Sequence, residues 1–84
     1  MDWRQYIHTD PEILLGKPVV KGTRLSVDFI LRLFAVGWTE RQVLENYPTL
    51  TPQTLRAVFA FAAESIGEET MFSMPVGAAH AVAG

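Results

Sequence analysis

The segment from residue 16 to residue 24 carries the densest group of chemistry-bearing residues in the chain. It reads Gly-Lys-Pro-Val-Val-Lys-Gly-Thr-Arg, so its two glycines, one proline and three cations stand close together. Glycine tolerates positive φ and proline fixes φ, so this backbone needs defined conformations. Lys17, Lys21 and Arg24 are suited to contact the DNA backbone or an acidic partner. They are equally suited to keep an exposed strand edge soluble.

A segment rich in glycine and lysine invites comparison with the phosphate-binding loop of nucleotide-binding proteins. In that loop the second glycine is followed directly by lysine and then by serine or threonine. Here Gly16-Lys17 comes first, and Gly22 is followed by Thr23 with no lysine between them. The order of the residues therefore argues against a nucleotide site.

Side chains for catalysis or metal binding are scarce. His8 and His80 are isolated, and neither has ligand-like spacing to a carboxylate or to another histidine. The chain has no cysteine, which removes thiolate chemistry and disulfides, and no carboxylate cluster suggests a metal site. Asp10 and Glu12 are explained by a turn around Pro11. We therefore expect a non-enzymatic protein with no metal and no cofactor.

The composition suits one small domain with a surface for a partner. The chain has 84 residues, a formal net charge of −2 and 49% hydrophobic residues. The negative charge counts against general DNA affinity but permits a local basic patch. The hydrophobic excess suits an interface with a partner or a second copy. Because no signal peptide or membrane span is recognisable, we expect a cytoplasmic protein without membrane contact.

Short extended segments are expected before residue 26. Tyr6-Ile7-His8 suits a strand, and residues 13–15 suit one turn of helix ended by Gly16. Val19-Val20 and residues 23–25 flank Lys21-Gly22, which predicts a hairpin with a two-residue turn.

Three helices are expected after this region, because apolar residues then recur at helical spacing. The first helix is expected to begin after a Ser26 cap and to end at Gly37. The second, over residues 40–47, begins with a Thr39–Gln42 capping box. The third begins with a Thr51 cap followed by Pro52 and ends at Gly67. The predicted fold is mainly α, a three-helix helix-turn-helix domain with a small N-terminal β-hairpin over residues 1–67. Residues 68–84 are predicted to form a flexible or partner-binding C-terminal tail.

A helix-turn-helix makes the third helix a candidate reader of DNA. Its early positions Gln53, Thr54 and Arg56 are expected to be exposed, and such side chains contact base edges and phosphates. The alternative is that they are ordinary solvated residues of a helical bundle.

The third helix is also apolar on two sides. Its predicted core stripe consists of Leu55, Val58, Phe59, Ala62 and Ile66. On the opposite side Ala57, Ala60 and Phe61 accompany Glu64, which predicts a homo-oligomer interface, a homodimer or larger. The alternative is a larger core onto which the N-terminal strands or the tail fold back.

Three segments together resemble a small prokaryotic family, number 433 among the domains of unknown function. They are residues 7–13, residues 16–27 and the Tyr-Pro-Thr-Leu-Thr turn at residues 47–51, and the resemblance covers about residues 4–66. The chain departs from the family pattern at Leu15, where a second glycine is common, and at Ser26, where proline is common.

The resemblance implies a homeodomain-like or winged-helix-like fold and a role as the antitoxin of a type II toxin–antitoxin pair. The implied partner is a PIN-like ribonuclease toxin, and such antitoxins often bind their own operator DNA as dimers. Met71, Phe72, Met74 and Val76 are predicted to contact the toxin, because methionine suits adaptable contacts. The alternatives are a tail without a role and a protein-interaction module that forms a homo-oligomer and binds no DNA.

Overall fold

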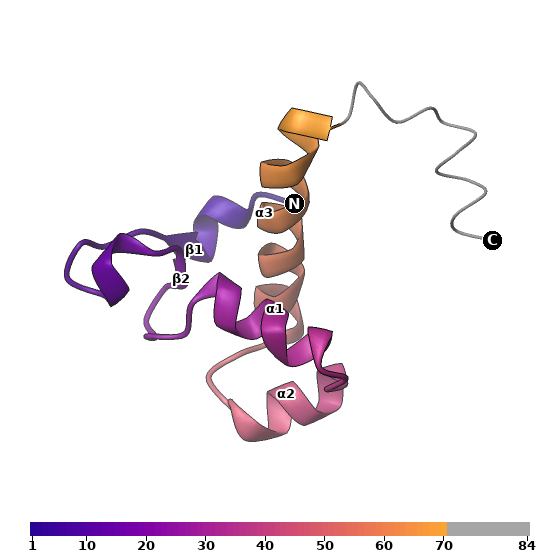
Figure 1. Ribbon diagram of the computed structural model, residues 1–84. Helices are drawn as coiled ribbons and strands as arrows, with labels where there is room; N and C mark the ends of the chain where they lie inside the picture. Colours follow the sequence, from indigo (N-terminus) through magenta and orange to yellow (C-terminus); the bar gives the residue numbers. More distant parts are fainter. Residues whose placement is uncertain (71–84) are drawn as a thin grey trace, which may run out of the picture.

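The computed structural model describes residues 1–70, which form three α-helices and a small two-stranded antiparallel sheet (Figure 1). No helix within this described part is long and apolar enough to cross a membrane. The elements in chain order are the 3-10 turn η1 (Trp3–Gln5), β1 (Ile7–His8), the 3-10 turn η2 (Leu14–Gly16), β2 (Val19–Val20), α1 (Val27–Ala35), α2 (Glu40–Asn46) and α3 (Pro52–Thr70).

The predicted ends of α1 and the start of α2 are confirmed. The Ser26 hydroxyl accepts a hydrogen bond from the Phe29 amide at 2.9 Å, so Ser26 caps α1 in the place where proline is common. Gly37 follows the helix with φ 103°, a left-handed conformation that suits glycine. Thr39 and Gln42 form the reciprocal capping box of α2.

The start of α3 is also as predicted, whereas its predicted end is wrong. The Thr51 hydroxyl accepts from the Thr54 amide at 3.1 Å, and Pro52 is the first helical residue. The helix then continues through Gly67 to Thr70. A glycine inside a helix costs only about 1 kcal/mol relative to alanine, which is too little to stop an established helix.

A tight turn at Lys21-Gly22 is present, with the Thr23 amide donating to Val20 O at 3.1 Å and Gly22 at φ 79°, but the predicted two-residue hairpin is not. β2 pairs with β1, in the register Ile7↔Val20 and His8↔Val19. Residues 20–25 form a wider loop, in which the Thr23 hydroxyl accepts from the Leu25 amide and donates to the Val20 carbonyl. Pairing resumes at Leu25, whose carbonyl accepts from the Val20 amide at 3.0 Å, so residues 21–24 join the paired segments.

The core lies where the three helices meet the sheet. Val19, Ile30, Val43 and Val58 are completely buried, and they come from β2, α1, α2 and α3 respectively. Each main element therefore contributes to one apolar core. The remaining buried apolar residues are Ile7, Val20, Val27, Leu50, Leu55 and Ala57.

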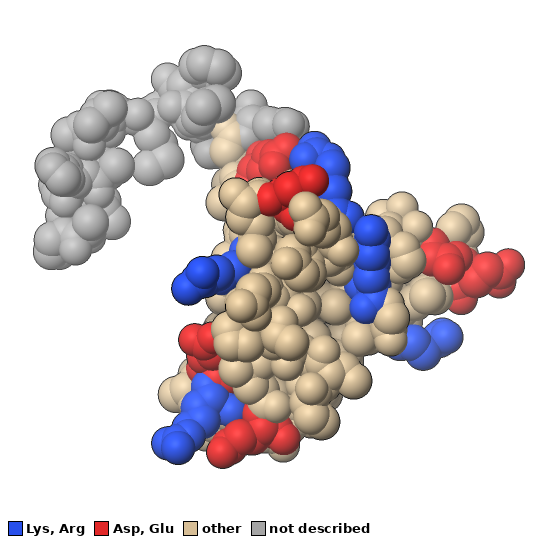
Figure 2. All heavy atoms as spheres, turned by 180° about the vertical axis from the view of Figure 1, so that it is seen from behind, with Lys and Arg blue, Asp and Glu red and all other residues tan. Residues whose placement is uncertain are grey.

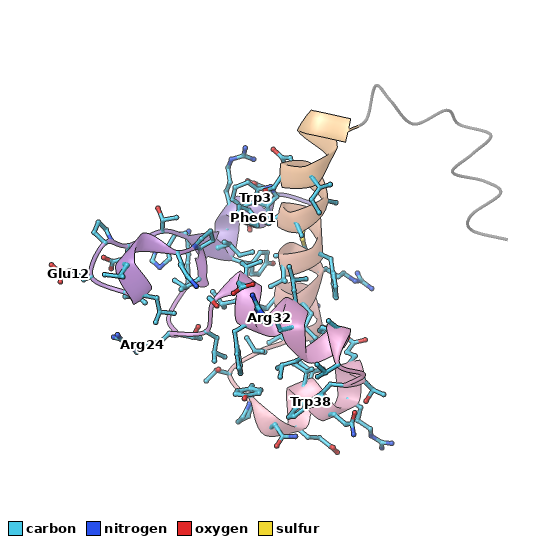
Figure 3. The ribbon with its side chains drawn as sticks, in the orientation of Figure 1. Trp3, Glu12, Arg24, Arg32, Trp38 and Phe61 are labelled. Atoms are coloured by element: carbon cyan, nitrogen blue, oxygen red, sulfur yellow. The ribbon has the colours of Figure 1, made fainter. Side chains whose placement is uncertain are left out.

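The N-terminus folds back on α3. The Trp3 ring meets Phe61 edge to face with 4.8 Å between centroids, and the two side chains lie together (Figure 3). The indole Nε1 of Trp3 donates to Glu64 at 2.6 Å, and the Arg4 guanidinium lies 3.5 Å from the same carboxylate. The face of α3 that carries Phe61 is thus covered by η1.

This docking overturns part of the predicted homo-oligomer face. Ala57 is completely buried and Phe61 is engaged by Trp3, so neither is available to a second copy. Ala60 is half-buried. The alternative of a core enlarged by the N-terminal segment is the one that the structure contains.

The predicted core positions Phe59 and Ile66 are also wrong. Their side chains are 45% and 62% exposed, whereas Leu55 and Val58 of the same predicted stripe are buried as expected. The upper turns of α3 extend beyond α1 and α2 (Figure 1). An apolar surface therefore remains on the outward side of this helix.

Replacing Trp3 by alanine is expected to lower the free energy of unfolding by about 2 kcal/mol, since a half-buried ring and its hydrogen bond are lost. Urea denaturation followed by circular dichroism measures the change. The control is Gln5→Ala, an exposed position of the same 3-10 turn, which should shift stability by less than about 0.5 kcal/mol. Equal stability of both variants would contradict the docking of η1 on α3.

Candidate functional site

Three successive residues of η2 have left-handed backbone conformations. The φ angles are 49° at Leu14, 57° at Leu15 and 83° at Gly16. The turn is closed by hydrogen bonds from the Gly16 amide to Ile13 O at 3.0 Å and from the Lys17 amide to Leu14 O at 3.2 Å. Glycine adopts this conformation without cost, whereas each leucine pays about 1–2 kcal/mol. The backbone is therefore strained at Leu15, the position where a second glycine is common in the family pattern.

The strained turn presents its leucines to solvent. Leu15 is 98% exposed and Leu14 is 40% exposed. An exposed leucine contributes no packing energy to offset the strain of its backbone. Backbone strain that stability does not explain is found preferentially at functional sites. This turn is therefore the strongest candidate for a site that binds a partner.

A shallow groove of about 450 Å³ lies beside the turn. Its surface is mainly apolar and includes the side chains of Leu14, Leu15 and Phe29, the last of which is 38% exposed. The side chains that line the groove are Leu14, Leu15, Lys17, Ser26, Asp28, Phe29 and Arg32. An apolar depression of this kind takes up an apolar side chain of a partner.

The rim of the groove carries a small ionic network. The Asp28 carboxylate lies 3.1 Å from Arg32 Nε and 3.9 Å from Lys17 Nζ. All three side chains are more than half exposed, so the pairs contribute little to stability. Two cations around one carboxylate leave the rim with a net charge of +1, which favours an acidic neighbour on a partner.

The cations of the chain do not form one continuous patch on the face shown in Figure 2, where Lys and Arg side chains lie scattered around an uncharged centre. Several of them are also neutralised by carboxylates. Lys17, predicted to contact the DNA backbone, pairs with Asp28. No ion pair to Lys21, Arg24 or Arg56 is seen among residues 1–70, and Arg24 points away from the body of the molecule (Figure 3).

The three predicted base-reading positions of α3 differ in exposure. Gln53 and Arg56 are exposed, as expected. Thr54 is only 7% exposed, and its hydroxyl lies 2.9 Å from that of Thr51. The expectation that Thr54 is exposed is therefore wrong, because its side chain belongs to the capping network at the start of the helix.

Two other groups of predicted or titratable residues lie apart from the groove or outside the described residues. The Nε2 atom of His8 is buried without a hydrogen-bond partner, and the described part of the chain holds no cluster of three metal-ligating side chains. The predicted toxin contacts, Met71, Phe72, Met74 and Val76, lie outside the described residues.

The Leu14–Leu15 surface was not among the predicted site residues. One signal was visible in the sequence, namely Leu15 in place of a glycine directly before Gly16. Its meaning depends on the positive φ angle at that position, which only the structure reveals.

Comparison with known proteins places the chain among its relatives. Residues 7–62 match the family described as "Protein of unknown function (DUF433)". The chain belongs to the DUF433 family. It is also 34% identical over 59 residues to the "Uncharacterized protein y4eO" of Sinorhizobium fredii, an alignment that covers 70% of this chain and 27% of that protein. The chain thus spans about a quarter of the length of this curated relative. No solved structure matches it significantly.

The segment that matches DUF433 contains the whole groove. The lining residues fall between positions 14 and 32, inside the matched range, whereas Trp3 precedes that range. Most of the outward-facing upper half of α3 follows it. The groove is therefore a feature of the DUF433 region, whereas the contact of Trp3 with Phe61 and Glu64 extends beyond that region.

Replacing Leu15 by glycine is expected to raise the free energy of unfolding by about 0.5–1 kcal/mol, since glycine relieves the left-handed strain and the exposed leucine gives up no packing. Leu15→Ala is the matched control, because alanine retains the Cβ atom and its strain. Thermal or urea unfolding measures both. Identical stabilities of the glycine and alanine variants would contradict strain at this turn.

Proposed function

We propose that this DUF433 chain is a non-catalytic protein-binding module that acts as the antitoxin of a type II toxin–antitoxin pair in the cytoplasm. The observation that carries the protein-binding part is Leu15, which is 98% exposed at φ 57° beside an apolar groove. The toxin partner, a PIN-like ribonuclease, is inferred from the family resemblance alone. A homo-oligomeric interaction module without such a toxin is the alternative.

The groove supports a particular kind of contact. The side chains of Leu14, Leu15 and Phe29 offer an apolar seat about the size of one or two side chains. Apolar area removed from water contributes about 25 cal/mol per Å², so covering an exposed leucine is favourable. The net positive rim then selects a partner segment in which an acidic residue flanks the apolar one.

The arrangement of the helices supports the finer fold proposal. α2 and α3 are joined by a tight turn, in which the Leu50 amide donates to Tyr47 O at 2.9 Å. Two helices joined in this way are compatible with a helix-turn-helix of the homeodomain-like or winged-helix-like kind. We include this fold type in the proposal.

Operator DNA stays a prediction beside the protein-binding function. The exposed Gln53 and Arg56 on α3, together with Lys21 and Arg24, are the described side chains that remain suited to it. Against it stand the net charge of −2 and the pairing of Lys17 with Asp28.

A salt series tests the DNA prediction. Mobility-shift assays on the promoter of the gene are expected to show binding that falls at least tenfold between about 50 and 200 mM salt, and further in Arg56→Ala. The protein-binding proposal does not require any shift. Absence of a complex at the lowest salt would therefore remove the DNA prediction alone.

Binding of the toxin is expected to depend on the groove. Leu15→Asp and Phe29→Ala should weaken co-purification with a neighbouring PIN-like nuclease at least tenfold, and should release its ribonuclease activity. Leu15→Gly should weaken binding as well while the fold becomes more stable, since it removes the side chain and the strain together. Loss of stability therefore cannot explain that result.

Val36→Asp is the control, because Val36 is 74% exposed at the other end of α1 and does not line the groove. It should bind as the wild type does. Full binding by Leu15→Asp and Phe29→Ala would contradict the groove as the contact surface. Failure of the wild-type chain to bind or inhibit the nuclease would contradict the antitoxin role.

A further inference from the structure

The outward side of α3 carries a repeat that differs from its core stripe. Arg56, Phe59, Ala63 and Ile66 follow one another at intervals of three, four and three residues. This is the spacing of the a and d positions of a coiled coil, whose seam faces a second helix. We call these four residues the α3 seam.

The α3 seam lies on the surface. Phe59 and Ile66 are 45% and 62% exposed, and Ala63 and Arg56 are also exposed. The core side of the helix carries Leu55, Ala57 and Val58, and η1 covers the side of Phe61. The seam is a third side of the helix that borders the core side, because the Phe59 ring packs edge to face against Phe34 of α1 with 5.1 Å between centroids.

The residues that flank the seam are small. On one side stand Ala60 and Gly67, and on the other stands Ala62. A Cβ atom added to Gly67 would meet no atom within 4 Å, so there is open space beside the helix at that level. Small flanking residues let a second helix approach closely, while Phe59 and Ile66 supply the apolar contact.

The seam is complementary to itself when two helices run antiparallel. In antiparallel coiled coils each a position lies opposite a d position of the other helix. The bulky Phe59 then lies opposite Ala63 of the partner subunit, and the twofold symmetry repeats this contact. Arg56 similarly lies opposite Ile66 of the partner subunit.

The charges along α3 also favour an antiparallel partner. The first turn of α3 has no acidic residue and its last turn has no basic one, so neither end carries the charge that the helix dipole favours. Arg56 is the only charged residue among positions 52–58. A second helix in the opposite direction brings each Arg56 toward the dipole-negative, C-terminal end of the other helix.

We infer that the α3 seam is a self-association surface, on which α3 of a second copy packs antiparallel with Phe59 opposite Ala63. The occupant is a second copy of this chain because size and charge both match under a twofold axis. The surface is separate from the groove at Leu15, so the inference does not rest on the proposed toxin. The contact from Arg56 to Ile66 is roughly 15 Å long, which suits a dimer that dissociates on dilution.

Sedimentation velocity of the full chain over a concentration series tests the association. The wild type is expected to pass from monomer to dimer, and Ala63→Glu should shift the midpoint to at least tenfold higher concentration, since it places carboxylates against the Phe59 rings. Because Ala63 is exposed and glutamate favours helix, the fold should persist, which circular dichroism verifies. Gln5→Glu adds the same charge on η1 and should dimerise as the wild type does.

The direction of the two helices has its own measurement. The chain has no cysteine, so Gln53→Cys introduces a single site for a nitroxide label. Antiparallel pairing separates the two labels along the helix axis by roughly 24 Å, whereas parallel pairing leaves them about 10 Å apart across the interface. Pulsed electron paramagnetic resonance distinguishes the two.

A long label distance together with a dimer weakened by Ala63→Glu supports the inference. A wild type that stays monomeric at millimolar concentration overturns it, as does an Ala63→Glu variant that dimerises normally. A short label distance overturns the antiparallel arrangement.

Discussion

The position of β2 is the constraint on which the rest of the structure depends. This strand of two residues is held on both sides, by β1 through Ile7↔Val20 and by the segment that leads into α1 through the bridge Val19↔Ser26. The Val27 amide donates to Pro18 O at 2.9 Å, which ties the first residue of α1 to the same segment. Because β2 is tied to both, the N-terminal quarter of the chain and α1 form one unit.

Two surfaces follow from this arrangement. The turn at Leu14 and Leu15 is brought beside the first turns of α1, which creates the groove with its ionic rim. The same unit places η1 against α3, where the Trp3 ring packs on Phe61 and its indole N–H donates to Glu64. Since η1 and the core occupy two sides of α3, its third side, with Ala63 and the partly exposed Phe59, stays on the surface. Both surfaces are thus consequences of how the N-terminus is anchored.

The accuracy of prediction from the sequence varied with the range of the interactions concerned. The capping residues Ser26 and Thr39, the Gly37 stop and the start of α3 were predicted correctly, because each depends on hydrogen bonds within a few residues. The pairing of β2 with β1 was not predicted, because η2 and its flanking turns separate the two strands in the sequence. The site was mostly missed, because an exposed leucine and a core leucine look alike in a sequence.

By itself, the sequence determined the helices, their caps, membership of the DUF433 family and the scarcity of catalytic groups. Local hydrogen bonding and helical periodicity carry that information. Only the tertiary structure decided that the Phe61 side of α3 is covered as well, because the docking of Trp3 joins residues 61 positions apart. It also decided that the Leu15 backbone is left-handed and its side chain exposed. That conformation arises where the turn closes between the paired strands β1 and β2.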